Sequence, residues 1–412
     1  MSLATQQELE SRYVMGTFAR KPVEFVSGKG MVLKDDAGRE YLDFIGGIGA
    51  DSLGHCPEAV VNAIEDQAKT LIHVSNYYYI EKRGEVAKMV SDMLNEGGTE
   101  PQDWKSFFAN SGAEANECSI KLARLYARRK WVEAGNEPLT SPRTIVVLEK
   151  SFHGRTLATL AATAQQVKQE WFQPLPSGFV TTPVNDIEAL EKLFDEMGDQ
   201  ICGMLLEVIQ GESGVNPCTP EFLAAVRRLT EEHGAMMICD EVQCGIYRTG
   251  TYPFAFQHYG ITPDIVSIAK GIGGGFPCGM SAARAEIAAA YEPGDHGSTF
   301  GGSNLAVAAI HATLSEIQAR GIADQVTRVG DYMRGKLEAM PQAKVVRGKG
   351  LMLAIDLADD VETSAPDAVL AGLEAGLVLN YTGPRTMRFL PPLICTEADV
   401  DVLVDKLDKL LA

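Results

Sequence analysis

Long apolar segments are missing from this sequence of 412 residues. No run approaches the roughly 18 consecutive apolar residues that a membrane-spanning helix needs. The first residues, MSLATQQELESRY, are polar and lack the apolar core of a secretory signal. We therefore expect a cytoplasmic protein that does not enter a membrane.

Metal-binding patterns are missing as well. The eight cysteines are scattered without a Cys-x-x-Cys pair, and the seven histidines show no ligand spacing. In a cytoplasmic chain of this size the thiols are expected to stay reduced. The sequence therefore predicts neither a disulfide framework nor a protein-bound metal.

Positive charge is scarce, because 37 lysines and arginines face 55 acidic residues and the formal net charge is −18. Nucleic acids bind to basic surfaces, so this balance argues against a nucleic-acid partner. It also repels anionic small molecules at long range. A carboxylate or phosphate ligand must therefore be held by local groups such as arginines, backbone amides and helix N-termini.

Between about residues 60 and 300, helical patterns alternate with short apolar runs that end at a glycine or a charge. Such runs are typical of strands buried on both faces. A helix is predicted over Glu221–His233, with Thr219 and Pro220 at its start. The alternation predicts a mainly parallel sheet covered by helices. The apolar runs are RTIVVLEKSFHG (143–154), ICGMLLEVIQGE (201–212), AMMICDEVQCG (235–245) and PDIVSIAKGIGGG (263–275).

The two ends of the chain have a different pattern. We predict a large domain over residues 61–305 and a small domain that residues 1–60 and 306–412 build together. The elements expected in these ends are a hairpin region over 22–45 with its turn at DDAG (35–38), a long helical stretch beyond about 305, strands near 345–356 and 387–390, and an amphipathic helix over 397–411.

Polar residues that follow the apolar runs are the candidates for function, because ligands of open α/β sheets bind beyond the carboxyl ends of the strands. An acid, a lysine, an anion cradle and an arginine at one edge form an unusual set. The candidates are Ser111-Gly112, His153-Gly154-Arg155, Glu207 to Glu212, Asp240 with Gln243, and Lys270.

Lys270 and Asp240 close two successive apolar runs. An isolated lysine after a strand is usually just solvated, but partial desolvation lowers the pKa of a lysine and makes it a nucleophile toward aldehydes. A carboxylate after AMMIC needs a cationic partner. That partner is either another side chain or the protonated ring nitrogen of a pyridine-type cofactor.

Ser111-Gly112-Ala113-Glu114 precedes the helical pattern of residues 115–129. A Ser-Gly turn at a helix N-terminus offers free amides and a favourable dipole to a phosphate, although the same residues also serve as a plain helix cap. No Gly-Lys-Ser/Thr is present, and the glycines after Lys270 lack the spacing of a dinucleotide fingerprint.

Longer motifs join these candidates in a fixed order along the chain. They are YLDFIGGIGADSLGHC (41–56), NSGAEANE (110–117), SFHGRT (151–156), LEVIQGESGV (206–215), DEVQCGIYRTG (240–250), SIAKGIGGGFP (267–277) and HGSTFGGSNLA (296–306).

This ordered set resembles the class III, ornithine-type aminotransferases, nearly from end to end. The resemblance implies pyridoxal 5′-phosphate (PLP) as cofactor and an α/β structure of PLP fold type I. Its large domain would hold a mainly parallel sheet of seven strands covered by helices, beside a small α+β domain from both chain ends. The resemblance also implies a homodimer whose active sites are shared across the interface.

Within the class, three stretches are most similar to acetylornithine aminotransferases. The implied reaction, part of arginine biosynthesis, transfers the δ-amino group of N2-acetyl-L-ornithine to 2-oxoglutarate and gives N-acetylglutamate 5-semialdehyde and glutamate. The stretches are YVMGTFARKPV (13–23), LIHVSNYYY (71–79) and MRFLPPL (387–393).

The resemblance also implies a role for single residues. Lys270 would hold PLP as a Schiff base and then move a proton on the substrate. Asp240 would pair with the ring nitrogen. The other implied cofactor contacts are Gln243 at the ring hydroxyl, Phe152 on the ring face, Ser111, Gly112 and Ala113 at the phosphate, and Thr299 reaching the phosphate from the partner subunit.

Two arginines would bind the substrates. Arg155 and Arg388 would take substrate carboxylates, and Glu212 would shield Arg388 when no second carboxylate is present. Phe18 stands where ornithine aminotransferases have a tyrosine that contacts the free α-amino group, which disfavours free ornithine.

Three departures from the family pattern concern loops of the site. Ala113 replaces a usual threonine, GHCPE (54–58) lacks the second histidine of GHCHP, and GGSNLA (301–306) has Ser-Asn in place of Asn-Pro. The alternatives are another ω-aminotransferase with 4-aminobutyrate, succinylornithine or ornithine as donor, a PLP-dependent aminomutase, and a non-catalytic binding protein.

Overall fold

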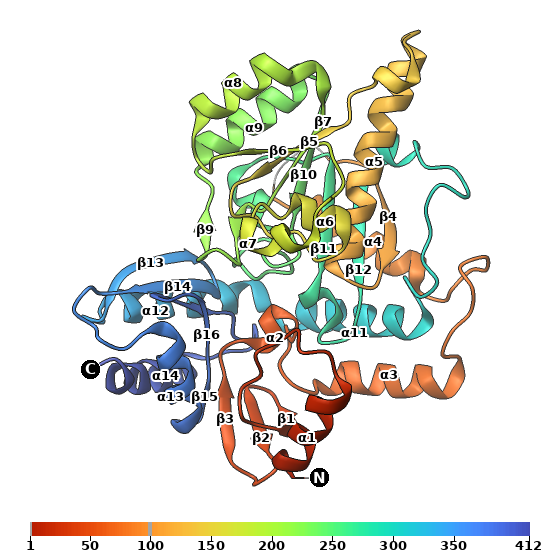
Figure 1. The fold of residues 1–412 in the computed structure, drawn as a ribbon. Coiled ribbons are helices and arrows are strands. Elements are labelled where there is room, and N and C mark those ends of the chain that lie inside the picture. The colour runs from red at the N-terminus through yellow and green to blue at the C-terminus, as the bar shows by residue number, and fades with distance from the viewer. Residues whose placement is uncertain (1, 98–100) are drawn as a thin grey trace.

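The centre of the protein is a seven-stranded sheet, seen in a computed structural model that describes residues 2–97 and 101–412. Strand β12 is antiparallel to both of its neighbours, and the other strands are parallel. This confirms the predicted α/β architecture with a mainly parallel sheet (Figure 1). In sheet order the strands are β4 (Trp104–Ala109), β12 (Gly279–Arg284), β11 (Ile265–Ala269), β10 (Met236–Asp240), β7 (Ile201–Leu206), β5 (Thr144–Leu148) and β6 (Phe179–Thr182).

Both faces of this sheet are buried under helices. Along β5, Ile145 and Val147 join the apolar cluster beneath helix α5 (Gly112–Glu133), whereas Val146 and Leu148 join the cluster on the other face. Helices α8 (Ile187–Met197) and α9 (Pro220–Glu232) cover that second face. Continuous apolar runs such as TIVVL thus reflect two covered faces.

Helix α9 begins as predicted. The Phe222 N–H donates to the Thr219 hydroxyl at 3.2 Å, and Pro220 occupies the first turn, where a missing N–H costs no helical hydrogen bond.

The N-terminal segment forms a second, smaller sheet with strands β1 (Phe25–Lys29), β2 (Val32–Asp35) and β3 (Glu40–Asp43). The turn predicted at 35–38 is present, since the Gly38 N–H donates to the Asp35 carbonyl. The run VEFVSGKGMVL, predicted as one side of a hairpin, instead contains two strands. Gly30 takes a left-handed φ of 59° between them and lets the chain reverse.

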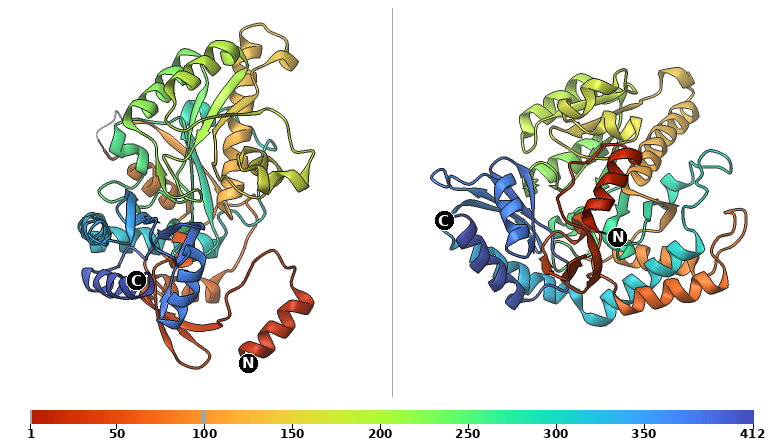
Figure 2. Two further views of the ribbon diagram at one scale, coloured as in Figure 1. Left: turned by 60° about the vertical axis from the view of Figure 1, so that its left-hand side comes forward. Right: turned by 60° about the horizontal axis from the view of Figure 1, so that its bottom comes forward.

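The C-terminal segment packs beside the N-terminal one (Figures 1 and 2), and β15 (Leu377–Val378) pairs with β3. The helical stretch predicted beyond residue 305 is two helices, because Gly321 is left-handed between them. The elements are α11 (Asn304–Arg320), α12 (Ile322–Glu338), β13 (Ala343–Lys349), β14 (Met352–Leu357), α13 (Ala365–Glu374), β16 (Asn380–Gly383), β17 (Thr386–Phe389) and α14 (Glu397–Leu410).

Helices α1 (Leu3–Tyr13), α3 (Glu58–Thr70) and α4 (Arg83–Leu94) precede the large sheet in the chain. Helix α1 buries none of its residues. Helices α3 and α4 both contact α11. Within the described residues, no helix is both long and apolar enough to span a membrane.

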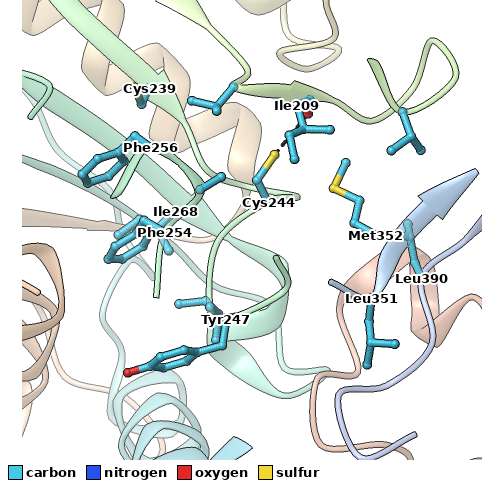
Figure 3. Packing of buried hydrophobic residues seen from close by; sticks show 14 of the residues in the cluster. Ile209, Cys239, Cys244, Tyr247, Phe254, Phe256, Ile268, Leu351, Met352 and Leu390 are labelled. Atoms are coloured by element: carbon cyan, nitrogen blue, oxygen red, sulfur yellow. Dashed lines mark hydrogen bonds between the residues drawn. The ribbon is translucent and has the colours of Figure 1, made fainter. Parts of the chain in front are cut away.

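One apolar core joins the large sheet to the C-terminal strands. Figure 3 shows Met352 pointing toward Ile209 and Cys244, with Leu351 and Leu390 beside Met352, and all five belong to one apolar cluster. The Cys244 thiol donates to the Ile209 carbonyl at 3.1 Å. This packing brings β17, which carries Arg388, against the loops that follow β7 and β10. The predicted boundaries at residues 60 and 305 stay a prediction.

Candidate active site

A cavity of about 420 Å³ lies at the carboxyl edge of the large sheet. Strands β4, β5, β7, β10 and β11 all end at this edge because they are parallel to one another. Twelve of the residues singled out from the sequence line the cavity: Ser111, Gly112, Ala113, Phe152, His153, Gly154, Arg155, Glu207, Glu212, Asp240, Gln243 and Lys270.

The N-terminus of α5 forms one side of the cavity. Ser111 caps the helix, since its hydroxyl accepts from the Glu114 N–H at 3.1 Å. The N–H groups of Gly112 and Ala113 have no helical acceptor in this first turn and carry the positive end of the helix dipole. A Cβ at Gly112 would lie 2.7 Å from Val242, so only glycine lets the helix start here. This arrangement is suited to an anion.

Asp240 forms a buried carboxylate at the end of β10, with 3% of its surface exposed. Its Oδ2 accepts from the Asn116 side chain at 2.7 Å and lies 2.7 Å from His153 Nδ1. Its Oδ1 accepts from the Val242 N–H at 3.1 Å. These contacts fix the orientation of the carboxylate and leave it able to meet a cation in the cavity.

Lys270 follows β11 directly and holds a left-handed backbone with φ of 51°. This conformation is uncommon for any residue other than glycine, and such strain is concentrated at functional sites. Ser52 fixes the turn by donating to the Gly271 carbonyl at 2.6 Å. Burial is the largest cause that lowers the pKa of Lys270, while Glu212 opposes it. A lysine with a lowered pKa is a better nucleophile near neutral pH.

Glu207 ties together two of the loops around the cavity. Its carboxylate accepts from the Phe152 N–H at 2.9 Å and from the Gly211 N–H at 3.0 Å. Burial raises its pKa to about 7. Through these bonds Glu207 sets the positions of the loop with Phe152 and Arg155 and of the loop with Glu212.

Arg388 is 2% exposed and reaches the site from β17. Its guanidinium donates to Glu212 at 2.7 Å, to the Gly211 carbonyl at 2.9 Å and to the Gln243 side chain at 3.1 Å. The pKa of Glu212 is lowered to about 2; burial alone would raise it, but Arg388 and Lys270 outweigh that effect. Arg388 Nε is buried and lacks a hydrogen-bond partner among the described residues.

Two predicted site residues lie outside the cavity. Thr299 is exposed and lines a separate cavity of about 900 Å³ with Ser298 and Phe107. Phe18 is 77% exposed in the segment after α1. Their predicted roles, at a partner subunit's phosphate and at the substrate, stay predictions.

Two residues that hold Asp240 had no predicted role. His153 lay within the candidate set, and Asn116 lay within NSGAEANE, but neither was connected to Asp240. The sequence spacing gives one indication that Asn116 faces the site, because a residue four positions after Gly112 lies on the same face of a helix. Nothing in the sequence pairs His153 with a residue 87 positions later.

Comparisons with known proteins agree with this geometry. The family model for aminotransferase class-III matches residues 17–411. The acetylornithine aminotransferase of Caldanaerobacter subterraneus subsp. tengcongensis is 46% identical over 407 residues, which cover 98% of each chain.

Solved structures are similar over almost the whole chain as well. The acetylornithine aminotransferase from Elizabethkingia anophelis has a TM-score of 0.85 at 31% identity, with 100% of this chain and 99% of that one covered. A Toxoplasma gondii ornithine aminotransferase structure, with PLP partly occupying its active site, has a TM-score of 0.89 at 28% identity, with 99% and 94% covered. The chain therefore belongs to the class III aminotransferases, which are PLP-dependent enzymes of fold type I.

Proposed function

We propose that the protein transfers the δ-amino group of N2-acetyl-L-ornithine to 2-oxoglutarate. The observation that carries this proposal is the Arg388–Glu212 pair at 2.7 Å, set against an Arg155 that has no carboxylate partner among the described residues. One arginine is thus shielded within the site and the other is open to a ligand. Relatives named acetylornithine aminotransferase, at 38% to 46% identity, support the choice of donor.

The residues of the cavity fit PLP. The free N–H groups at the start of α5 suit its phosphate. The buried carboxylate of Asp240 suits a protonated ring nitrogen, and the Phe152 ring can cover a flat face. Lys270 would hold the cofactor covalently through its amino group. When bound, PLP supplies the electron sink that makes a proton on the substrate carbon acidic.

Lys270 is the group placed to move that proton. Its lowered pKa gives it a free amine in a larger fraction of molecules, so it can accept a proton from the substrate carbon and return it elsewhere. Asn116 and the Val242 N–H donate to the Asp240 carboxylate and hold it in place. The negative charge of Asp240 favours a cationic ring, and a cationic ring withdraws electrons better.

The two arginines divide the carboxylates between them. N-acetylornithine, which reacts at its δ-amino group, would place its distant α-carboxylate on Arg155. Glutamate would place its α-carboxylate on Arg388 and its γ-carboxylate on Arg155. Glu212 would then have to leave Arg388 for the second substrate, since an unpaired buried charge is costly at either step.

We also propose a homodimer in which Thr299 contributes to the phosphate site of the partner subunit. Support comes from exposed aromatic residues near the cavity that Thr299 lines. Tyr77 is 95% exposed, Tyr79 102% and Phe300 60%. Aromatic side chains gathered at a surface are typical of interfaces. Light scattering would give the mass of the assembly, and Thr299→Ala should weaken PLP binding while leaving a dimer.

The cytoplasmic location expected from the sequence remains a prediction.

One steady-state screen tests the proposed donor. N-acetylornithine, succinylornithine, ornithine and 4-aminobutyrate are each supplied with 2-oxoglutarate, and glutamate is measured. The proposal expects the highest kcat/KM with N-acetylornithine. A higher value with another donor would move the assignment to that ω-aminotransferase. Turnover of an amino acid without any 2-oxoglutarate would indicate an aminomutase instead.

A further inference from the structure

Two cationic side chains meet at one aromatic ring beside the cavity. The Arg155 guanidinium carbon lies 5.6 Å from the centroid of the Phe152 ring, and Lys168 Nζ lies 4.9 Å from the same centroid. Phe152 and Arg155 both line the cavity. Lys168 comes from helix α7 (Gln166–Gln169), in the loop region between β5 and β6.

The loop fixes Lys168 from both sides. The Gln165 side chain donates to the carbonyls of Lys150 and Ser151, at 3.2 and 3.0 Å, and thereby joins the loop to the end of β5. The Gln169 side chain donates to the carbonyls of Leu160, Ala161 and Thr163, at 3.0, 3.2 and 2.8 Å. Lys168 therefore projects from a segment whose position is set by side chains on either side of it.

Among the residues that the structure describes, no carboxylate forms an ion pair with either of these two cations. Within residues 2–97 and 101–412, neither the Arg155 side chain nor the Lys168 side chain forms an ion pair or donates a hydrogen bond. Glu212 Oε1 accepts from Arg388 and Gln243, and both oxygens of Glu207 accept backbone N–H groups. Burial is the largest cause that lowers the pKa of Lys168. The charge of Arg155 lowers it further, whereas the charges of Glu212 and Glu207 oppose this shift.

Two unpaired cations at one ring are unusual in a chain with a net charge of −18. The chain has 55 acidic residues, yet among the described residues none forms an ion pair with Arg155 or Lys168. An anionic ligand that enters the cavity would relieve the repulsion and gain two charge-assisted hydrogen bonds.

We propose that Lys168 and Arg155 together bind the distal carboxylate of the substrates, so that Lys168 is a second specificity-determining residue of this subsite. The proposal rests on the proposed function only for the identity of the donor. It requires a carboxylate at the far end of the substrate, which N-acetylornithine, 4-aminobutyrate and 2-oxoglutarate all have.

The competing explanation gives Lys168 a structural role. Its stem would pack on Phe152, and its ammonium group would make only a cation–π contact. Both explanations predict some loss when the side chain is removed. They differ in whether the loss depends on the substrate's carboxylate.

Three variants separate these explanations. Lys168→Met keeps an apolar stem over Phe152 and removes the charge, and Lys168→Arg keeps the charge. Lys192→Met removes the same charge from α8, where the side chain is 74% exposed, and serves as the matched control. Thermal unfolding of each variant shows whether the fold is intact.

The half-reaction of each variant with excess 4-aminobutyrate and with butylamine, which lacks the carboxylate, is followed in single turnovers. Lys168→Met should weaken the apparent affinity for 4-aminobutyrate by roughly 10- to 100-fold, the range for a lost hydrogen bond to a charged group. The maximal rate should change little, and butylamine should react as in the wild type. Lys168→Arg should restore most of the loss, and Lys192→Met should match the wild type.

Binding of glutarate, which has no amino or keto group, gives a second measurement without turnover. Its Kd should rise by a similar factor in Lys168→Met. Equal losses with 4-aminobutyrate and butylamine would establish a structural role and overturn the proposal, and so would an unchanged Kd for glutarate. Failure of the wild type to use N-acetylornithine would overturn the proposed donor alone, because 4-aminobutyrate and glutarate test Lys168 independently.

Discussion

The inner wall and the mouth of the cavity differ in whether their charged side chains have partners within the protein. On the inner wall, which consists of Asp240, Lys270 and the Arg388–Glu212 pair, the carboxylates have partners within the protein and Arg388 is 2% exposed. At the mouth, Arg155 is exposed, Lys168 is half-buried, and neither has an anionic partner among the described residues. The two carboxylates of the inner wall and Arg388 are thus paired within the protein, whereas the two cations at the mouth are not.

This difference indicates a division of work. A buried charge without a partner is costly, so the charges of the inner wall are held in place before any ligand arrives. A partly solvated cation without a partner costs less free energy, because water still screens its charge. We therefore expect changes to Asp240 and Lys270 to reduce the rate of chemistry, and changes at the mouth to reduce affinity for substrates that carry a carboxylate.

The largest effect is expected at Lys270. Lys270→Ala should abolish transamination and the absorbance band of the bound cofactor, because the protein loses both its covalent attachment point and the group that moves the proton. Absorbance spectra and steady-state rates measure both. Lys150→Ala is the control, since Lys150 also follows a strand with a left-handed φ of 62° but is exposed. Near-normal activity of Lys270→Ala would remove Lys270 from the mechanism.

Asp240 should give the next largest effect, in both half-reactions. Asp240→Asn keeps the size of the side chain and loses its charge, so proton transfer should slow at least about a hundredfold, on the order of 3 kcal/mol. Single-turnover rates would show it. Asp264→Asn removes another buried carboxylate, one that precedes β11 at the opposite edge of the sheet, and should lower stability without this kinetic effect. A loss below about threefold for Asp240→Asn would mean that the ring nitrogen has another partner.

Variants of Arg388, on the inner wall, and of Arg155, at the mouth, test the difference between these two parts of the cavity. Arg388→Ala should slow the half-reaction with glutamate by roughly 2 kcal/mol or more and leave the half-reaction with N-acetylornithine much less affected. Arg155→Ala should damage both, since every proposed substrate places a carboxylate there. Single-turnover spectra follow each half separately. Equal slowing of both halves by Arg388→Ala would show that the arginines do not divide the carboxylates.

Much of the inner wall could be predicted from the sequence because strand ends are local signals. An apolar run that stops at Asp240 or Lys270 places that residue at the carboxyl edge of a parallel sheet, and Ser111 before a helical pattern places a cap there. The same reasoning predicted the start of α9 at Thr219 and Pro220.

The contacts between strand ends could not be predicted in this way. His153 meets Asp240 only because β5 and β10 lie on either side of β7. Lys168 follows β5 in an irregular loop, and no periodic pattern marks a residue that reaches a ring from such a segment. The turn at Gly30 could not be predicted because this run contains two glycines, Gly28 and Gly30, and the sequence does not show at which of them the chain reverses.

Glu212 should give the smallest kinetic effect and the clearest dependence on pH. Glu212→Gln leaves Arg388 free of its internal carboxylate, so glutamate should bind better and N-acetylornithine should bind worse, each by on the order of 1 kcal/mol, about fivefold. The change should lie in affinity, because Glu212 is proposed to compete with a substrate carboxylate and to take no part in proton transfer. KM values for both substrates measure it.

The pKa of Glu212 determines the accompanying change in stability. Its folded-state pKa is about 2, below the ordinary 4.5, so the ionised form is favoured by folding. The wild type should therefore exceed Glu212→Gln in free energy of unfolding by a constant amount above about pH 5, and that excess should shrink as the pH falls from 4.5 toward 2. Urea unfolding of both proteins across this range would measure it. An excess that stays constant down to the acid limit would show that the carboxylate of Glu212 does not neutralise Arg388, and the contrast between a paired inner wall and an unpaired mouth would lose its basis.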